Sequence, residues 1–296
     1  MPIMRFKCKK HMNNHKKIGS SENTTIDNSD YLINQKQTVE KTSDNTIKQT
    51  MQNFVNCCNQ GNIEEAYNML TDECKEKLYP TVQDFYQNYI TIVFNEEKEY
   101  TMQAWDQQDD EDEIGIYTYS VTIMQNILAT GNAGNKIQEY YTFIKQSDGS
   151  YKINVNNYIY SEAYDDLSTT QDGIKVEILS KDVYKDYAIY EFQVYNFTDS
   201  KVLLNGSKAR KAVYLSDKND VVYSSIQSEF DKGEEIIINA KNYRKFRVKF
   251  NKKYNTNVVV RTLNLTDVVF NYDEYKQTEE NGEQYTNREL IQADLL

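Results

Sequence analysis

The spacing of apolar residues changes once along this chain, near residue 96, and this change limits the folds open to it. Before residue 96, apolar side chains recur at steps of three and four, which places them on one face of a helix. After residue 96 they alternate with polar side chains, which places them on one face of a strand. A block of helices followed by strands predicts an α+β fold.

Particular residues mark the ends of the helices expected between residues 43 and 94. Ser43 or Asp44 can cap the first helix, and Gly61 can end it because glycine adopts a positive φ without strain. The later signals are caps at Asn62 and Thr71, a stop at Pro80 and a capping-box-like pair at Thr81 and Asp84. The side chains expected on the apolar faces are Ile47, Met51, Phe54, Val55, Cys58, Ile63, Ala66, Tyr67, Leu70, Val82, Phe85, Tyr86, Tyr89, Ile90, Val93 and Phe94.

Alternation from residue 100 to residue 155 predicts about four long strands with polar outer faces, which fits an antiparallel sheet with one solvated side. Asp148-Gly149 lies between two alternating segments and predicts a hairpin. From about residue 173 the pattern is strand throughout. About seven short strands in about 100 residues, with turn residues at regular spacing, predict a β-sandwich.

The expected organisation has five parts. In chain order they are a disordered basic and polar leader (1–42), an α+β domain (43–160), a linker (161–172), an all-β sandwich (173–276) and an acidic tail (277–296). The formal charge of −11 is unevenly distributed, because residues 1–20 contribute +6 and leave −17 for the rest. We expect the leader to be a solvated basic tail, with contact to anionic lipid as the alternative.

The composition argues against several classes of protein. Duplex binding relies on Lys and Arg to neutralise phosphates, so an acidic chain is not expected to bind nucleic acid. The chain has no apolar run of about 18 residues, so no transmembrane helix is expected. The basic start is followed by the polar residues 18–23, so neither a signal peptide nor an anchor is expected in this sequence.

Cysteine and histidine are sparse. Cys8, His11 and His15 form a C-x2-H-x3-H cluster, which is one ligand short of a closed structural zinc site, so no metal site is assigned. Cys57, Cys58 and Cys74 are expected to be buried or half-buried free thiols, and a Cys58–Cys74 disulfide stays open if the chain is exported. Both histidines lie in the leader, which argues against a histidine-dependent mechanism.

No constellation of residues in the sequence predicts catalysis or cofactor binding, and no catalytic, cofactor-binding or metal residue is assigned. Asp84 is expected to cap a helix, and the acid-rich run 106–113 is expected to be a solvated loop, with calcium binding as the alternative. The Gly-rich segment 131–135 lies between strands, so it lacks the helix that a phosphate site needs. Five tyrosines are expected to pack in the core, with a ligand cavity as the alternative: Tyr117, Tyr119, Tyr141, Tyr158 and Tyr160.

Residues 54–71 resemble the opening of the nuclear transport factor two-like superfamily. The resemblance is carried by a helix that ends in Gly61-Asn62, a Glu65-Ala66-Tyr67 helix and Leu70-Thr71, and residues 72–94 continue it. It covers 43–160 and implies three to four helices on a strongly curved antiparallel sheet, a cone with an interior cavity. Residues 173–276 are similar to the immunoglobulin-like domains that accompany such modules in surface proteins of low-GC Gram-positive bacteria.

The resemblance implies a non-enzymatic binding or structural protein of the cell envelope, extracytoplasmic or membrane-associated, with a protein or glycan partner. The alternative is an isomerase- or dehydratase-type enzyme in the cone, which needs a buried acid and tyrosine donors. A third possibility is an assembly subunit of an envelope or conjugation complex. The superfold serves all three classes, so the ligand and the oligomeric state stay open.

Overall fold

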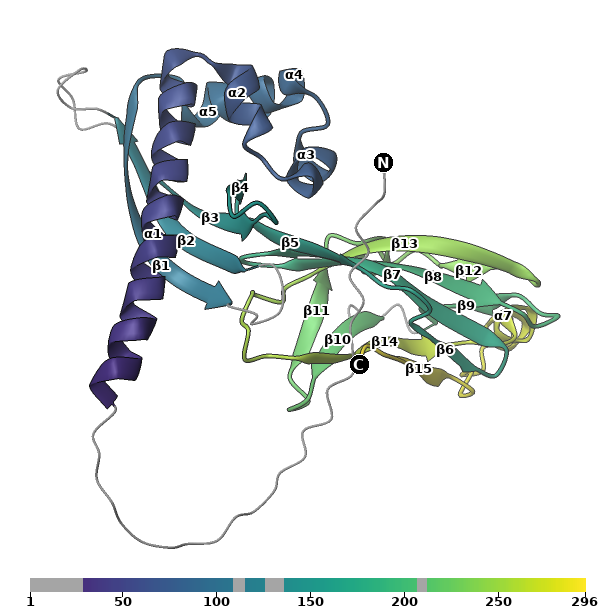
Figure 1. The fold of residues 1–296 in the computed structure, drawn as a ribbon. Helices are drawn as coiled ribbons and strands as arrows, with labels where there is room; N and C mark the ends of the chain where they lie inside the picture. Colours follow the sequence, from purple (N-terminus) through teal and green to yellow (C-terminus); the bar gives the residue numbers. More distant parts are fainter. Residues whose placement is uncertain (1–28, 109–114, 126–135, 207–211) are drawn as a thin grey trace, which may run out of the picture. The chain divides into compact units, whose positions relative to one another are not determined.

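The computed structural model describes residues 29–108, 115–125, 136–206 and 212–296, with the backbone alone for 29–44, 107 and 108 (Figure 1). The chain divides into two compact units, Met1–Asn156 and Asn157–Leu296. Helices come first and antiparallel strands follow, so the predicted α+β class is confirmed.

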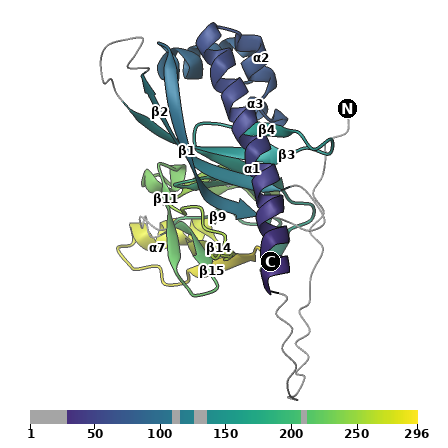
Figure 2. The same cartoon turned by 60° about the vertical axis from the view of Figure 1, so that its left-hand side comes forward.

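The first unit begins with a long helix, α1 (Ser29–Gln60), which Gly61 ends at a φ of 75°. The helix starts within the segment predicted to be a disordered leader, so that prediction is wrong from Ser29 onward. The predicted apolar face of α1, from Ile47 to Cys58, is buried. Figure 2 shows α1 crossing one face of the four-stranded sheet of this unit.

The short helices that follow confirm most of the predicted caps. They are α2 (Ile63–Asn68), α3 (Asp72–Leu78), α4 (Val82–Phe85) and α5 (Thr91–Val93). Thr71 Oγ1 accepts the Cys74 N–H at 3.0 Å, and Thr81 and Asp84 form a reciprocal capping box. Asn62 is the exception, because its side chain makes no hydrogen bond to the start of α2.

The single long helix predicted over residues 82–94 is interrupted. A π-helical turn, Tyr86–Ile90, separates α4 from α5. This wider turn changes which residues share a face. Phe85, Tyr89 and Ile90 stay buried, whereas Tyr86, predicted on the apolar face, is 44% exposed.

The sheet of the first unit is antiparallel, in the order β1-β2-β3-β4. Its strands are β1 (Lys98–Gln108), β2 (Ile116–Gln125), β3 (Ile137–Lys145) and β4 (Tyr151–Asn154). Gly149 has a φ of 83°, and the Gln146 N–H donates to the Ser150 carbonyl at 2.8 Å, so the predicted Asp148-Gly149 hairpin is confirmed. The apolar and aromatic side chains that β2 and β3 bury are Tyr117, Tyr119, Val121, Ile123, Tyr141 and Phe143.

The second unit is dominated by one strongly curled antiparallel sheet in the order β15-β14-β10-β11-β13-β8-β7-β5, with β6 also paired to β7. Its strands are β5 (Tyr158–Ala163), β6 (Ser168–Gln171), β7 (Ile174–Tyr184), β8 (Ala188–Asn196), β10 (Val213–Asp217), β11 (Val222–Ile226), β13 (Asn242–Phe250), β14 (Val260–Val268) and β15 (Glu289–Asp294). The Asp294 N–H donates to Thr169 Oγ1 at 3.3 Å, so β15 lies beside β6 and the sheet wraps around its own core. A ribbon of β9 (Val202–Leu203) and β12 (Ile237–Ile238) is separate from this sheet.

Two segments expected to be irregular contain structure. The expected linker, 161–172, holds the end of β5 and all of β6. The expected acidic tail, 277–296, holds the end of α7 (Tyr272–Glu280) and all of β15, so the tail prediction is wrong. Ile291 and Ala293 alternate with polar residues along β15 and are buried in the core, and this burial holds the acidic segment in the sheet.

Candidate functional site

Aromatic rings fill the interior between the helices and the sheet of the first unit. The centroid of the Phe54 ring lies 6.5 Å from that of Phe85, and 6.2 Å from those of both Phe94 and Tyr141. Phe85 stacks on Tyr89 at 5.4 Å, with 13° between the ring planes. All five rings are buried. Side chains therefore occupy the space where the superfamily resemblance implies a cavity.

A carboxyl group lies among these rings. Glu139 on β3 pairs with Val121 across the sheet and is 8% exposed. Tyr89 Oη donates to Glu139 Oε2 at 3.1 Å, and the hydroxyls of Tyr89 and Tyr141 are hydrogen bonded to each other. Burial raises the pKa of Glu139, and the hydrogen bonds from Tyr89 and from the backbone of Asn156 oppose part of that rise.

This buried cluster of Glu139, Tyr89 and Tyr141 has the chemistry of an acid–base site. A carboxyl group beside two linked hydroxyls can exchange a proton with them, and burial holds the pKa of both tyrosines well above 10.0. Sequence reasoning missed Glu139, although a signal was present. Residue 139 has the same parity as Tyr141 and Phe143, so the strand pattern places it on the apolar face.

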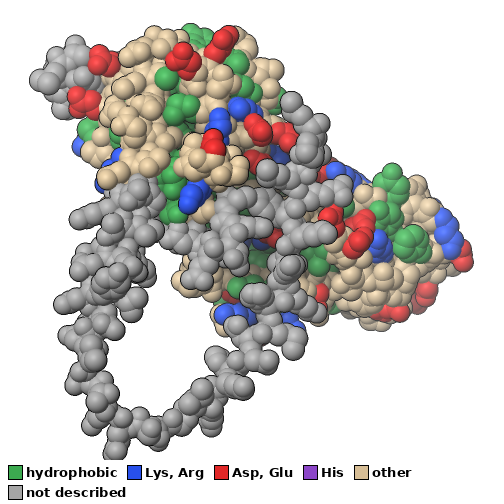
Figure 3. Space-filling view, in the orientation of Figure 1, with side chains coloured by type: hydrophobic (Ala, Val, Ile, Leu, Met, Phe, Trp, Pro, Cys, Tyr) green, Lys and Arg blue, Asp and Glu red, His purple; other side chains and the backbone are tan. Residues whose placement is uncertain are grey.

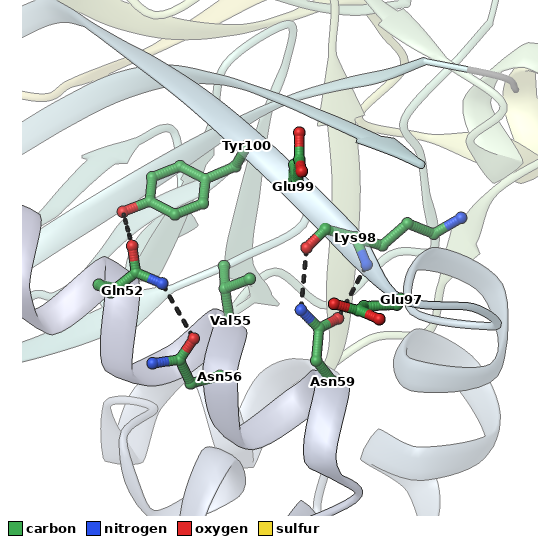
Figure 4. A pocket seen from close by; sticks show the side chains of 8 residues that line it. All are labelled: Gln52, Val55, Asn56, Asn59, Glu97, Lys98, Glu99 and Tyr100. Carbon is green, nitrogen blue, oxygen red and sulfur yellow. Dashed lines mark hydrogen bonds between the residues drawn. The ribbon is translucent and has the colours of Figure 1, made fainter. Parts of the chain in front are cut away.

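A polar groove of about 330 Å³ lies between α1 and β1 of the same unit (Figure 4). Its lining comprises Gln52, Val55, Asn56, Asn59, Glu97, Lys98, Glu99 and Tyr100. Asn59 Nδ2 donates to the Lys98 carbonyl at 2.8 Å, and the Lys98 N–H donates to Asn59 Oδ1 at 3.0 Å. The amide of Asn59 thus pairs with edge strand β1 much as a neighbouring strand does. These bonds tether α1 to the sheet, and we assign the groove a structural role.

Three aromatic side chains lie together on the outer face of the second unit, and we call Tyr195, Phe197 and Tyr243 the aromatic patch. Tyr195 and Tyr243 are register partners across β8 and β13, with ring centroids 5.5 Å apart. The ring of Phe197, just after β8, stacks with that of Tyr195 at 5.7 Å and 16°. Phe197 is 51% exposed and Tyr243 is 58% exposed. Figure 3 shows exposed hydrophobic side chains beside charged ones over the second unit near β13.

Ion pairs hold the aromatic patch in place. Lys175 Nζ lies 5.2 Å from the centroid of the Tyr195 ring and 2.9 Å from Glu177 Oε1. Tyr195 Oη donates to Glu177 Oε2 at 2.8 Å, and this hydrogen bond raises the pKa of Tyr195. Lys241 Nζ donates to the Phe197 carbonyl at 2.6 Å and pairs with Asp199 at 2.9 Å. These contacts hold the Tyr195 ring and the backbone of Phe197 in place.

The residues that the sequence analysis names as candidates lie in different parts of the structure. Tyr117, Tyr119 and Tyr141 are buried in the first unit, whereas Tyr158 and Tyr160 belong to β5 in the second. These five tyrosines therefore do not converge on one cavity within a unit. Asp84 caps α4, as predicted. The candidates that lie outside the described residues are Cys8, His11, His15, the acids of 109–113 and the segment 131–135.

The three described cysteines are free thiols, so Cys58 and Cys74 do not form a disulfide. Burial raises the pKa of Cys74 to about 12 and also raises that of Cys58, which keeps both thiols protonated. The glycosylation motif Asn-x-Thr occurs at Asn196 and Asn264. Both asparagine side chains are buried in the core, where they cannot accept a glycan.

Across the described parts of the chain, no three His, Cys, Asp or Glu side chains gather into a group able to hold a metal ion. None of the described helices is both long and apolar enough to span a bilayer. Neither a scan against protein-family models nor a search of curated proteins finds a match to this sequence.

Proposed function

We propose that this chain is a non-enzymatic binding protein of a bacterial cell envelope, and that its aromatic patch binds a glycan. The observation that carries this proposal is the group of adjacent rings of Tyr195, Phe197 and Tyr243, of which Phe197 and Tyr243 are exposed. Exposing large aromatic side chains in a contiguous group costs solvation free energy, so such groups commonly mark a binding surface. The ion pairs around the rings keep that surface ordered before a ligand arrives.

The chemistry around the rings favours a sugar over an apolar protein surface. The flat face of an aromatic ring packs against the C–H face of a pyranose, and the sugar hydroxyls then need donors and acceptors at the rim. The Lys175–Glu177 and Lys241–Asp199 pairs supply both at the edges of the patch. An aliphatic partner would have to desolvate these charges without compensation, which disfavours it.

We also propose that the two units retain the finer folds that the resemblance implies. Helices that cover one face of a four-stranded antiparallel sheet support a cone of the nuclear transport factor two-like kind. Antiparallel strands wrapped around a shared core support a relationship of the second unit to immunoglobulin-like domains. The envelope location rests on that same resemblance.

Binding to purified Gram-positive cell-wall sacculi tests the proposed function. The double variant Phe197→Ala, Tyr243→Ala should lose about tenfold or more in affinity, because each ring contributes on the order of 1 kcal/mol in a stacked contact. The matched control is Val221→Ala, Val222→Ala, which truncates two other exposed apolar side chains of the same unit. Equal binding by the double variant and the wild type would show that the aromatic patch is not the glycan-binding site.

The cluster of Glu139, Tyr89 and Tyr141 supports a second candidate, an acid–base enzyme of isomerase or dehydratase type. The packed rings of Phe54, Phe85 and Phe94 oppose it, because a substrate would have to displace them. Glu139→Gln distinguishes the two functions. It should leave binding to sacculi unchanged, whereas turnover of a small carbonyl compound that disappears in this variant would favour the enzyme.

A further inference from the structure

A lysine is buried near one end of the curled sheet with its charge incompletely satisfied. Lys252 follows β13 and is 8% exposed. Its Nζ donates to the Lys253 carbonyl at 2.8 Å and lies 5.6 Å from the centroid of the Tyr223 ring. Among the ion pairs of the described residues, none includes Lys252. An ammonium carries three donors, so two remain for another partner.

The charge of a second lysine, Lys181, repels that of Lys252. Lys181 on β7 is the register partner of Tyr190, a core residue of β8, so it faces the concave side of the sheet. Its Nζ pairs with Glu162 Oε2 at 2.7 Å and lies 5.7 Å from the centroids of both the Tyr160 and the Tyr164 ring. Glu162 therefore balances Lys181 and forms no ion pair with Lys252.

The acid whose field reaches Lys252 is already engaged elsewhere. Asp217 accepts the N–H groups of Asn219 at 2.8 Å and Val221 at 3.0 Å, and its other oxygen accepts the Tyr223 hydroxyl at 2.9 Å. It makes no ion pair with Lys252 in the described structure. Burial and then repulsion from Lys181 lower the pKa of Lys252, and Asp217 only partly opposes this.

A buried ammonium without an ion pair is costly, and its two remaining donors are suited to an oxyanion. We propose that the second unit binds a small-molecule oxyanion, a carboxylate or phosphate group, at Lys252. The Tyr223 ring contacts Lys252 and can pack against the apolar part of such a ligand. This site is independent of the aromatic patch.

Thermal unfolding of the full chain tests the proposal, with near-ultraviolet circular dichroism of tyrosine as the readout. Inorganic phosphate and acetate are titrated separately against chloride at constant ionic strength, so the two arms separate a phosphate from a carboxylate. One of them should raise the Tm of the wild type by about 4 °C. Lys252→Met should abolish this rise, whereas the exposed control Lys245→Met should keep it.

General salt effects on stability raise the Tm of every variant equally, so an equal rise in Lys252→Met would overturn the proposal. The absence of a rise with either anion in the wild type would overturn it too. Lys252→Arg keeps the charge and should keep the response, which covers the case in which the methionine variant does not fold. In the wild type, NMR titration of the lysine side chains should show the pKa of Lys252 rising when the effective anion is added.

Discussion

Glu139 in the first unit and Lys252 in the second are both 8% exposed, yet their surroundings differ. Glu139 accepts hydrogen bonds from Tyr89 and from the backbone, and packed rings surround it. Lys252 makes one hydrogen bond to a neighbouring carbonyl and has a like charge nearby. A buried acid with neutral donors around it completes a core, whereas a buried cation with unused donors leaves a site for an anion.

The largest expected effect comes from opening the interior of the first unit. Phe54→Ala removes a ring that contacts three others, so we expect it to lower the free energy of unfolding by about 4 kcal/mol. The chain's single tryptophan, Trp105, lies on β1 of this unit, so its fluorescence in urea reports the loss directly. A change below about 1 kcal/mol would show that this interior is loosely packed, and would favour a ligand cavity between the helices and the sheet.

A smaller loss is expected in the second unit, where a buried amide connects separate segments. Asn196 Nδ2 donates to the carbonyls of Ser200 at 2.8 Å, Ile238 at 3.1 Å and Asn239 at 3.1 Å, and its Oδ1 accepts the Thr198 N–H at 2.9 Å. Asn196→Ala leaves these groups without partners, which should cost about 2 kcal/mol. Tyrosine circular dichroism should show the loss. A parallel shift in the Trp105 signal would mean that the two units unfold together.

A pH-dependent effect follows from Glu139. Its pKa is raised above the ordinary value of 4.5, so the native state binds more protons than the unfolded state once the pH exceeds about 4.5. The stability of the first unit should therefore fall as the pH rises through that window and level off above the native pKa. Glu139→Gln should remove this fall in urea midpoints read from Trp105. An identical pH profile in the variant would mean that Glu139 is not the group responsible.

The helical part of the fold was predictable because its signals are local. Gly61, Thr71 and the Thr81–Asp84 pair act through their own backbone neighbours, and each ends or begins a helix as predicted. The π-helical turn at Tyr86–Ile90 was not, because the helical period extends through those residues without a break. Packing against the sheet, which the local sequence does not encode, determines which of those rings is buried.

The candidate sites escaped prediction for different reasons. Glu139 lies two residues before Tyr141 on β3, so strand alternation places both on the same apolar face. Its burial was therefore predictable from the sequence alone. Lys252 lies in an irregular segment, and Tyr223 on another strand helps to bury it, so no periodicity could reveal it. The acidic composition of 277–296 concealed the alternation of Ile291 and Ala293, which was a sounder guide than net charge.

The smallest expected effect on stability comes from a second Phe-to-Ala substitution, made at an exposed ring and not in the core. Phe197→Ala removes a ring that is 51% exposed and stacked on Tyr195, so the free energy of unfolding should change by about 0.5 kcal/mol or less. Tyrosine circular dichroism in urea measures this against Phe54→Ala. A loss of 2 kcal/mol or more would assign Phe197 to the core. A near-zero change would mean that this ring contributes little to folding, and its place on the surface would then need a ligand to explain it.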